Sequence, residues 1–532
     1  MLQEERLSRR GFVQGALTGG AALLATGALV ACSNNSPSEN TNTGDERVWD
    51  RTFDVVVVGT GFAGLASAVT AADKGSSVLV VEKAPETEAG GNSRVCAQAV
   101  WTPRDVPVAV KYFKEITQQE HLGDLSDAVI EAFITYSSNN REWLTDVIDI
   151  PVKTLSTAEY PAAPSANEVK NEGTTVHEDG LGSQRIWLAI MEAAVAKGVE
   201  FAYETPMTDL VFNGVDEVIG IKAKASGSEI SIAAKKAVIL CCGGFEFNEE
   251  MKANYLQFPS LAWGTPHNTG DGHKICMAYD IDFWHMNSAT PGTRIGIDMA
   301  EIDPARKNQS LDFEFSRGSG YLWLDKYGKR FMNEARPYQH GYGRNAVFYN
   351  DSLKMEWPRL PFWQVFDTEE TARLTAGGSG WLTNIDKIVV SEGFERELAA
   401  GVIVKAETAA ELAAQMGSDA AVVEGSINAF NEAATSGSDT AFGRPADNMR
   451  PLTPPYFAAR VYPVMVNTNG GPRRDEKARI LRTNGEPVKR LYSSGEFGSV
   501  WAWYYQGAGN VTECLAFGRI AGEQAAALEA WA

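Results

Sequence analysis

The stretch DVVVVGTGFAG at residues 54–64 decides the fold of this chain. Its apolar, β-branched first half predicts a buried strand, and its glycine turn opens an Ala-rich helical stretch that reaches Lys74. A second apolar run at 78–81 predicts another strand and ends at Glu82. Strand, glycine turn, helix, strand and acid follow one another within about thirty residues, which is the fingerprint of a dinucleotide-binding unit. We therefore predict an α/β fold with a parallel, Rossmann-like sheet.

The glycine turn has a direct physical purpose. A residue without a side chain lets the backbone approach a pyrophosphate, and the unpaired N–H groups and dipole of a helix N-terminus favour an anion. Glu82 would then accept hydrogen bonds from the adenosine ribose hydroxyls. The alternative is a cluster of helix-packing glycines followed by a surface acid. On the first interpretation the turn contacts the cofactor through Gly59, Gly61, Phe62, Ala63 and Gly64.

More of the chain fits FAD than NAD. A second glycine turn lies at 90–93, a strand at 237–240 runs into a Gly-Gly pair, and a glycine-rich turn at 507–511 precedes a helix through Glu529. The N-terminus of that last helix would face the flavin pyrimidine ring and stabilise negative charge there. The turn at 90–95 holds no histidine or cysteine, so we expect noncovalent FAD. Further expected contacts are Lys83, Gly91, Asn92, Ser93, Gly243, Gly244, Asp271, Glu496, Asn510 and Val511.

Composition excludes several other classes of protein. Of the 532 residues 44% are hydrophobic, enough for sizeable cores in two or three domains. A formal net charge of −20 would repel a nucleic-acid backbone. The six cysteines show no CxxC, CxxCH or other ligand spacing. We therefore expect no metal, iron–sulfur cluster or attached haem, and interpret the cysteines as scattered core thiols.

The first residues are typical of an export signal. A twin-arginine pair at 9–10 precedes an apolar run at 15–31, the pattern that directs folded proteins across a membrane. The segment LVAC at 29–32 resembles a lipobox, whose cysteine would carry lipid at the mature N-terminus. Plain cleavage near Ala31 and an uncleaved anchor are the alternatives. We expect a signal at 1–32, a polar tether at 33–50, and a protein that is lipid-anchored on the outer face of the cell membrane or periplasmic.

Beyond the fingerprint, ordered motifs run along the whole chain. They are NTGDG at 268–272, GKRFMNE at 328–334, PPY at 454–456, NGG at 469–471 and ECLAFGR at 513–519. With these motifs, residues 51–531 resemble the flavoprotein family of fumarate reductases, urocanate reductases and 3-ketosteroid dehydrogenases. The resemblance implies an FAD-dependent oxidoreductase that acts on a CH–CH or C=C bond.

The resemblance also implies a domain organisation. In this family an FAD domain built from both ends of the chain is covered by an inserted α+β capping domain. Here the FAD domain would span 51–294 and 451–532, and the cap would span 295–450. Amphipathic stretches at 406–416 and 420–434 predict two helices in the cap. Closure of the cap would exclude water from the site.

The active-site motifs depart from those of the fumarate enzymes. Those enzymes move a proton along a Glu–Arg–Arg relay and hold two carboxylates with histidines and a further arginine. Glu314 and Arg317 match the first two relay members in type and spacing, with a structural ion pair as the alternative. Tyr338 replaces the third member, and Asn467 and Gln506 stand where a substrate histidine and arginine would be. A dicarboxylate buried without these cations would be strongly destabilised, so fumarate is a poor candidate.

The replacements resemble the ketosteroid dehydrogenases instead. A tyrosine after the Asn-Glu motif and the segment YQGAG at 505–509 fit that group, although two residues of the segment stand where prolines are usual. The resemblance implies that Tyr505 and the Gly509 N–H hold a carbonyl oxygen and that Tyr338 is the acid–base. Packing alone is the alternative for Tyr505. Aromatic residues within 501–505 would line a pocket for a flat or apolar substrate.

We therefore predict an exported FAD-dependent reductase of an activated C=C bond, in an α,β-unsaturated carbonyl compound of ketosteroid or phenylpropanoid type. Hydride would come from flavin N5 and the proton from Tyr338. One alternative is a carboxylate-specific enoate reductase for fumarate-, urocanate- or cinnamate-like substrates, in which Arg336 or His340 meets a single carboxylate. A 3-ketosteroid-type dehydrogenase working in the oxidative direction is a second. A flavoprotein that only shuttles electrons or binds a ligand is a third.

The source of electrons follows from what the sequence lacks. It shows no haem motif, no obvious second flavin site and no second dinucleotide fingerprint. Reducing equivalents would then come from another protein, such as a membrane-anchored multihaem cytochrome on the same outer face, in anaerobic respiration. We expect a small unsaturated molecule as substrate, no nucleic-acid partner, and contact with the membrane only through the N-terminal anchor.

Overall fold

The structure is a computed structural model, and it describes residues 47–118, 125–155, 159–160, 162–169, 173–256, 259–313, 318–335, 344–375, 389–502 and 504–531. The chain divides into a unit that ends at Arg47 and a unit that runs from Val48 to Ala532, and the fold described below belongs to the second. The expected signal and nearly all of the expected tether lie outside the described residues. Within the part of the chain that the structure describes, no helix combines the length and apolar character needed to cross a membrane.

The fingerprint folds as its pattern predicts. β1 (Arg51–Val58) runs into the glycine turn, α1 (Phe62–Asp73) follows, and β2 (Val78–Val81) pairs in parallel with β1. Every residue of β2 is buried, as in a strand covered on both faces. Two parallel strands joined by a helix form the βαβ unit, so the predicted α/β class is confirmed.

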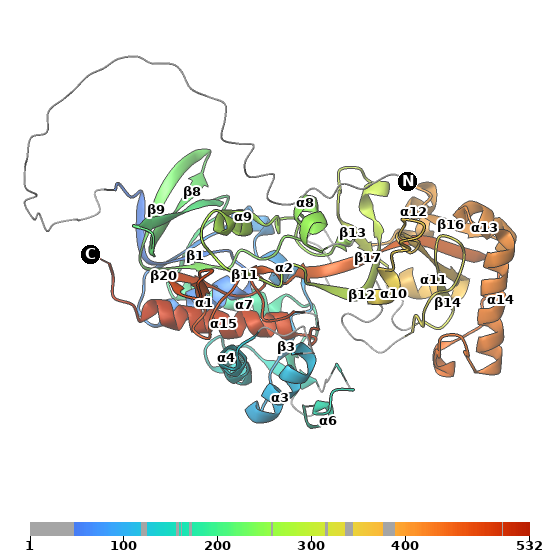
Figure 1. Ribbon diagram of the computed structural model, residues 1–532, viewed down its shortest axis with the longest axis horizontal. Helices are drawn as coiled ribbons and strands as arrows, with labels where there is room; N and C mark the ends of the chain where they lie inside the picture. The colour runs from blue at the N-terminus through green and yellow to red at the C-terminus, as the bar shows by residue number, and fades with distance from the viewer. Residues whose placement is uncertain are drawn as a thin grey trace, which may run out of the picture. The chain divides into compact units, whose positions relative to one another are not determined.

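The first sheet gathers strands from distant parts of the chain (Figure 1). Among the described residues its order is β19-β20-β8-β9-β1-β2-β6, with β7 beside β8. β1 and β20 both pair in parallel with β9, so late strands join the early ones. The bounds are β6 Glu200–Ala202, β7 Met207–Asn213, β8 Glu217–Ala225, β9 Ser228–Leu240, β19 Arg479–Leu481 and β20 Pro487–Ser493.

The two ends of the chain also share a helix interface. α15 (Gly509–Ala526) packs along α1. A Cβ at Gly518 would lie 2.8 Å from the Ala63 carbonyl oxygen, and one at Gly522 would lie 2.6 Å from the Ser67 carbonyl oxygen. Only glycine allows the two backbones to approach so closely. The FAD domain is therefore built from both ends of the chain, as predicted.

α15 is shorter than predicted, because it ends at Ala526 and not at Glu529. Beyond the helix, the Trp531 backbone N–H donates to the Lys235 carbonyl oxygen at 2.8 Å, and its indole N–H donates to the Ala234 carbonyl oxygen at 2.7 Å. The end of the chain thus lies along β9. These contacts take the place of further helical hydrogen bonds.

A second sheet forms the inserted cap. Its order among the described residues is β13-β12-β17-β15-β14, and β10 and β16 also pair with β17. The two predicted cap helices are present as α13 (Ala409–Met416) and α14 (Ala420–Ser436), so the α+β cap is confirmed. The strands are β10 Leu261–Ala262, β12 Ala289–Asp298, β13 Ser310–Asp312, β14 Tyr321–Leu324, β15 Phe362–Asp367, β16 Ile403–Ala406 and β17 Tyr456–Thr468.

The boundaries of the cap at 295 and 450 stay predictions. β12 enters the cap sheet a few residues before the first boundary, and β17 lies after the second. The cap has its own core, which includes Phe313, Phe366 and Phe394, all fully buried. The FAD domain has a core on each side of its sheet, because the side chains of β1 alternate between the two faces.

The remaining elements complete the two domains. A small sheet in the order β3-β5-β4 and a β11–β18 pair are found in the described residues. The strands are β3 Val100–Trp101, β4 Val152–Leu155, β5 Thr174–His177, β11 Phe283–Trp284 and β18 Gly471–Pro472. The helices are α2 Gly91–Val95, α3 Val106–Thr117, α4 Asp127–Ser138, α5 Asn140–Asp146, α6 Ala166–Val169, α7 Arg185–Ala196, α8 Glu249–Met251, α9 Asp271–Met277, α10 Arg344–Val347, α11 Thr368–Thr375 and α12 Glu395–Ala399.

Candidate functional site

A pocket opens at the carboxyl ends of β1, β2 and β9. Its lining comes from the turn between β1 and α1, from the residues that follow β2 and β9, from α2 and from the loop after β20. The carboxyl edge of an open parallel sheet is where such folds bind their ligands. The pocket therefore lies where the fingerprint places a dinucleotide.

The glycine turn makes a cradle that a side chain would fill. Gly59 adopts φ +106°, and a Cβ there would lie 2.4 Å from the Cys241 carbonyl oxygen. Gly61 stands at the N-cap of α1 and provides no side-chain hydrogen bond to the helix. The N-terminal end of α1 thus meets the pocket through bare backbone, which suits the pyrophosphate of FAD.

Glu82, the residue after β2, contacts the glycine turn. Its carboxylate accepts hydrogen bonds from the Thr60 N–H at 3.1 Å, from the Thr60 hydroxyl at 2.5 Å and from the Ala84 N–H at 2.9 Å. The side chain also lines the pocket. The carboxylate is therefore held in one orientation by the turn itself, and its predicted role toward ribose hydroxyls stays a prediction.

Lys83 and Asp271 form an ion pair at the pocket. The Lys83 ammonium lies 2.7 Å from Asp271 Oδ2 and donates to Thr269 Oγ1, also at 2.7 Å. Burial alone would raise the pKa of Asp271, but the hydrogen bond and charge of Lys83 outweigh it and lower that pKa. Two residues from separate motifs are thus brought together, as their shared assignment to the cofactor predicts.

The second glycine turn packs directly on the first. Gly90 adopts φ +111° and donates its N–H to Thr60 Oγ1 at 2.9 Å. Ser93 Oγ accepts the Phe62 N–H at 2.8 Å, and Asn92 reaches across the pocket wall. The start of α2 is therefore tied to the start of α1 by side-chain hydrogen bonds.

Most of the predicted cofactor residues line this one pocket. They are Gly59, Gly61, Phe62, Ala63, Glu82, Lys83, Gly91, Asn92, Ser93, Gly243, Asp271 and Glu496. Gly64, Gly244, Asn510 and Val511 are not part of its lining. A Cβ at Gly64 would lie 1.9 Å from the Gly59 carbonyl oxygen, and one at Gly244 would lie 2.3 Å from Thr468 Oγ1. Close packing accounts for these two glycines.

Sequence reasoning missed several residues of the lining. Thr60 lies inside the fingerprint itself, while Thr265, His267 and Asn268 precede the NTGDG motif or begin it. Cys241, Cys242 and Cys514 also line the pocket, so these thiols are not scattered. Burial raises the pKa of Cys241 to about 12, which keeps it a neutral thiol. Among the described residues, no cluster of His, Cys, Asp or Glu is suited to holding a metal ion.

The start of α15 carries the predicted carbonyl-binding residues. Tyr505 is nearly buried, and its hydroxyl accepts the Asn510 N–H at 3.3 Å. The Gly509 N–H donates to the Gln506 carbonyl oxygen at 2.8 Å. Binding of a substrate oxygen by that N–H would therefore require this turn to open. A Cβ at Gly509 would lie 2.3 Å from the Trp501 ring, so the glycine is needed for packing.

Two neutral amides occupy the positions that the sequence resemblance assigned to a substrate histidine and arginine. Gln506 Oε1 accepts the Tyr112 hydroxyl at 2.6 Å and the Glu159 N–H at 3.3 Å. Asn467 Oδ1 accepts the Asn510 amide N–H at 2.6 Å, and Asn467 is fully buried. Both amides are thus satisfied within the protein. Neither would supply the positive charge that a buried dicarboxylate requires.

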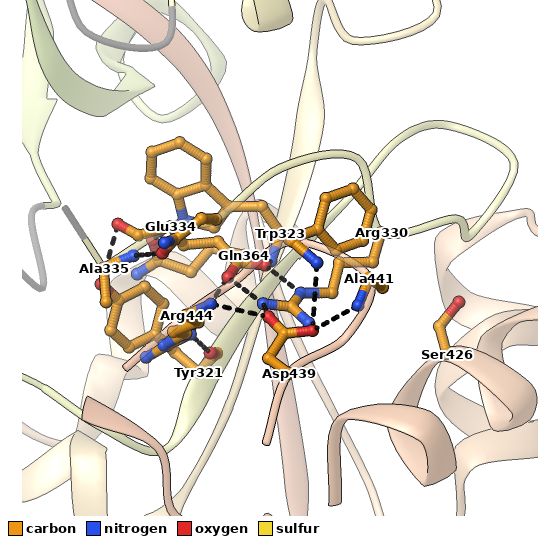
Figure 2. Close-up of polar contacts among 12 residues, drawn as sticks. Tyr321, Trp323, Arg330, Glu334, Ala335, Gln364, Ser426, Asp439, Ala441 and Arg444 are labelled. Atoms are coloured by element: carbon orange, nitrogen blue, oxygen red, sulfur yellow. Dashed lines mark hydrogen bonds and ion pairs between the residues drawn. The ribbon is translucent and has the colours of Figure 1, made fainter. Parts of the chain in front are cut away.

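The predicted catalytic residues of the cap, Glu314, Arg317 and Tyr338, lie outside the described residues, as do Arg336 and His340. The motif beside them is described, and Figure 2 shows its polar contacts. Arg330 makes a bidentate pair with Glu334, both contacts at 2.8 Å, and its Nη2 also lies 2.9 Å from Asp439.

A second arginine completes this arrangement. Arg444 Nη1 lies 3.1 Å from Glu334 Oε2 and donates to the Tyr321 carbonyl oxygen at 2.6 Å. We call Arg330, Glu334, Asp439 and Arg444 the cap ion cluster. All four side chains are nearly or completely buried. The Asn-Glu motif therefore anchors the cap through two acids and two arginines.

Comparison with known proteins agrees with this geometry. The family model described as FAD binding domain matches residues 54–512. A 3-oxosteroid 1-dehydrogenase of Mycobacterium tuberculosis is 28% identical, over 88% of this chain and 97% of its own length. A cytochrome-type fumarate reductase of Shewanella frigidimarina is 24% identical, over 89% of this chain and 77% of its own length.

A solved structure shares the fold. The 3-ketosteroid Δ1-dehydrogenase from Sterolibacterium denitrificans, determined in complex with 1,4-androstadiene-3,17-dione, superposes with a TM-score of 0.75 at 23% identity. The match covers 90% of this chain and all of that one. With the glycine cradle, the family match decides the cofactor as FAD. The chain therefore belongs to the FAD binding domain family and is an FAD-dependent oxidoreductase.

Proposed function

We propose that this chain acts on a carbon–carbon bond next to a carbonyl group, reducing an α,β-unsaturated carbonyl compound rather than a dicarboxylate. The observation that carries the proposal is the pair of buried amides, Asn467 and Gln506, each bound to a neighbouring side chain. Polar but uncharged side chains suit a neutral carbonyl compound, whereas a dianion would stay uncompensated.

Bound FAD supplies hydride transfer to and from carbon. The residues of this chain orient the substrate and move the proton. Tyr338 is the proposed acid–base, because a phenol can give a proton to carbon and take it back. Tyr505 lies next to the start of α15, where its hydroxyl meets the Asn510 N–H and can polarise a carbonyl oxygen.

The names of the relatives support action on a carbon–carbon bond, but they do not decide between reduction and oxidation. One is named a 3-oxosteroid 1-dehydrogenase and another a fumarate reductase, so both oxidation and reduction occur among proteins that resemble this chain. Steroid-like enones and phenylpropanoid enones are the proposed substrates. The carboxylate alternative depends on Arg336 or His340 meeting a single carboxylate.

The test is reoxidation of the dithionite-reduced holoenzyme, followed at the flavin absorbance band, with a panel of enones and enoates. Fast reoxidation by enones and none by fumarate is expected. Fast reoxidation by fumarate would overturn the proposal, and no response to any acceptor would favour an electron-shuttling flavoprotein. Replacement of Tyr338 by Phe should reduce turnover by about 10²-fold or more while the bound flavin is unchanged.

Export and the electron donor belong to the same proposal. The twin-arginine pair and the lipobox-like segment support a lipid-anchored protein on the outer face of the membrane. A separate cytochrome, supported by the cytochrome-type relative, would then supply electrons in anaerobic respiration. Replacing Arg9 and Arg10 with Lys should retain the protein in the cytoplasm, and replacing Cys32 with Ala should release it from the membrane fraction. Normal membrane localisation of both variants would contradict this.

A further inference from the structure

Two carboxyl groups meet at the wall of the FAD pocket with an amide between them. Glu246 follows β9, and Glu496 follows β20 and lines the pocket. The side-chain nitrogen of Asn92 lies 2.7 Å from Glu246 Oε1 and 3.4 Å from Glu496 Oε2. We call Glu246 and Glu496 the pocket acid pair. One donor group therefore serves two acids.

The orientation of the amide argues against a metal ion between these acids. Asn92 Oδ1 accepts the Thr265 N–H at 3.1 Å, so its N–H groups face the carboxyls. The Asn268 amide nitrogen lies 2.6 Å from the same oxygen of Glu246. Donor hydrogens pointing at the acids would repel a cation. A proton bound to one carboxyl meets no such obstacle.

The nearby cationic side chains form hydrogen bonds and ion pairs with other groups. Lys252, behind Glu246, donates to the Ser260 carbonyl oxygen at 2.9 Å and to Asn308 Oδ1 at 2.6 Å, and it pairs with Glu249 at 2.8 Å. On the other side, Arg474 pairs with Glu513 of α15. Neither cation makes a described hydrogen bond or ion pair with the pocket acid pair, and Lys252 acts on Glu246 only through its charge.

The remaining titratable neighbours of the pocket acid pair are an acid and two thiols, which bring no positive charge. Glu513 acts on Glu496 by charge repulsion, and the thiols Cys96 and Cys514 lie close enough to Glu496 to feel its charge. Burial raises the pKa of Glu246, against hydrogen bonds from Asn268 and Asn92 that lower it. Burial and then the charge of Glu246 raise the pKa of Glu496 well above its ordinary value.

We propose that Glu246 and Glu496 hold one proton between them at neutral pH, so that the pocket wall carries one negative charge there instead of two. The physical reason is the occupant: FAD brings an anionic pyrophosphate, and a second carboxylate at the wall would repel it. The protonated carboxyl also becomes a hydrogen-bond donor toward its neighbours. This inference rests on the FAD cofactor and not on the choice of substrate.

The direct test is infrared spectroscopy of the holoenzyme at neutral pH. A C=O stretching band of a protonated carboxylic acid is expected, and it should disappear in Glu246→Gln. Gln keeps an acceptor for Asn268 and Asn92, so this variant should still fold. Glu397→Gln is the matched control: that carboxyl is also fully buried, but Ser391 and Arg396 hold its pKa below the usual range against the effect of burial. It should leave the band unchanged.

A second readout is the affinity for FAD as a function of pH. In the wild-type protein the dissociation constant should rise with pH, by up to about tenfold per pH unit above the midpoint of the pair. The slope should flatten in Glu246→Gln and in Glu496→Gln. A wild-type holoenzyme without the infrared band, or an unchanged slope in both variants, would overturn the proposal. Inactivity toward every enone would not affect either readout.

Discussion

The cap ion cluster and the pocket acid pair solve the same problem in opposite ways. Each holds two carboxyl groups: both are buried in the cap, whereas at the pocket Glu246 is buried and Glu496 is half-buried in the lining. In the cap, Arg330 and Arg444 compensate the acids, and their hydrogen bonds lower the pKa of Asp439 although burial alone would raise it. At the pocket, burial raises the pKa of both acids, and the charge of Glu246 raises that of Glu496 further. An arginine side chain keeps its positive charge beside the acids. A proton can bind or leave, so the charge of the pocket wall can change when an anionic cofactor is present.

Removing a charge from the cap ion cluster should reduce the free energy of unfolding more than any other change proposed for these two regions. Glu334→Gln leaves the buried Arg444 guanidinium without its carboxylate and Arg330 with Asp439 alone, and breaking a buried ion pair in this way costs about 3–5 kcal/mol. The measurement is the free energy of unfolding from denaturant titration of the holoenzyme. A loss below about 1 kcal/mol would mean that the cluster behaves like a surface pair, and the contrast between the two regions would fail.

The two regions should also lose stability at opposite ends of the pH range. The folded pKa of Asp439 is depressed, so its contribution is present above the unfolded value near about 3.9 and is lost as the pH falls through the folded value. The folded pKa values of Glu246 and Glu496 are raised, so their contribution is present in acid and is lost as the pH rises through the folded values. Each proton changes stability by at most about 1.4 kcal/mol per pH unit.

Thermal unfolding across pH measures both slopes. Asp439→Asn should flatten the acid slope and leave the alkaline one, and Glu246→Gln should do the reverse. A variant that alters both slopes equally would show that the regions are not independent.

Replacing an acid of the pocket pair should reduce the free energy of unfolding far less than replacing Glu334 in the cap ion cluster. Glu246→Gln should change the free energy of unfolding at pH 7 by no more than about 1 kcal/mol, because the pair already holds a proton and Gln keeps the amide contacts. Denaturant titration beside Glu334→Gln gives the comparison. A loss as large as that of the cap variant would show that the pair holds no proton and that both acids are ionised.

An exposed ion pair should contribute least to the free energy of unfolding. The Arg51 guanidinium lies 2.6 Å from Glu200, with side chains 35% and 58% exposed. Solvent screens such a pair, so Arg51→Ala should cost about 0–1 kcal/mol in the same titration. A cost comparable to that of Glu334→Gln would mean that burial does not explain the strength of the cap cluster.

The sequence predicted much of the site because its signals are local. The turn, α1 and β2 follow one another directly, and closely spaced glycines between a strand and a helix are typical of a dinucleotide site. Glu246 was not predicted because it stands two residues after a Gly-Gly pair with no pattern of its own. Gly64 and Gly244 were expected at the cofactor, whereas the structure places them outside the lining, since sequence cannot separate glycines that admit a ligand from glycines that admit a neighbouring backbone.

By itself the sequence determined the Rossmann-like unit, because periodicity and turn residues act over a few neighbouring positions. Its motifs, through their resemblance to a flavoprotein family, also indicated the FAD cofactor and the inserted cap. Only the tertiary structure decided which buried acids meet a cation and which meet each other. Asn92 contacts Glu246 across 154 positions and Glu496 across 404. Charges interact through space, so their ionisation depends on the partners that folding brings within a few ångströms.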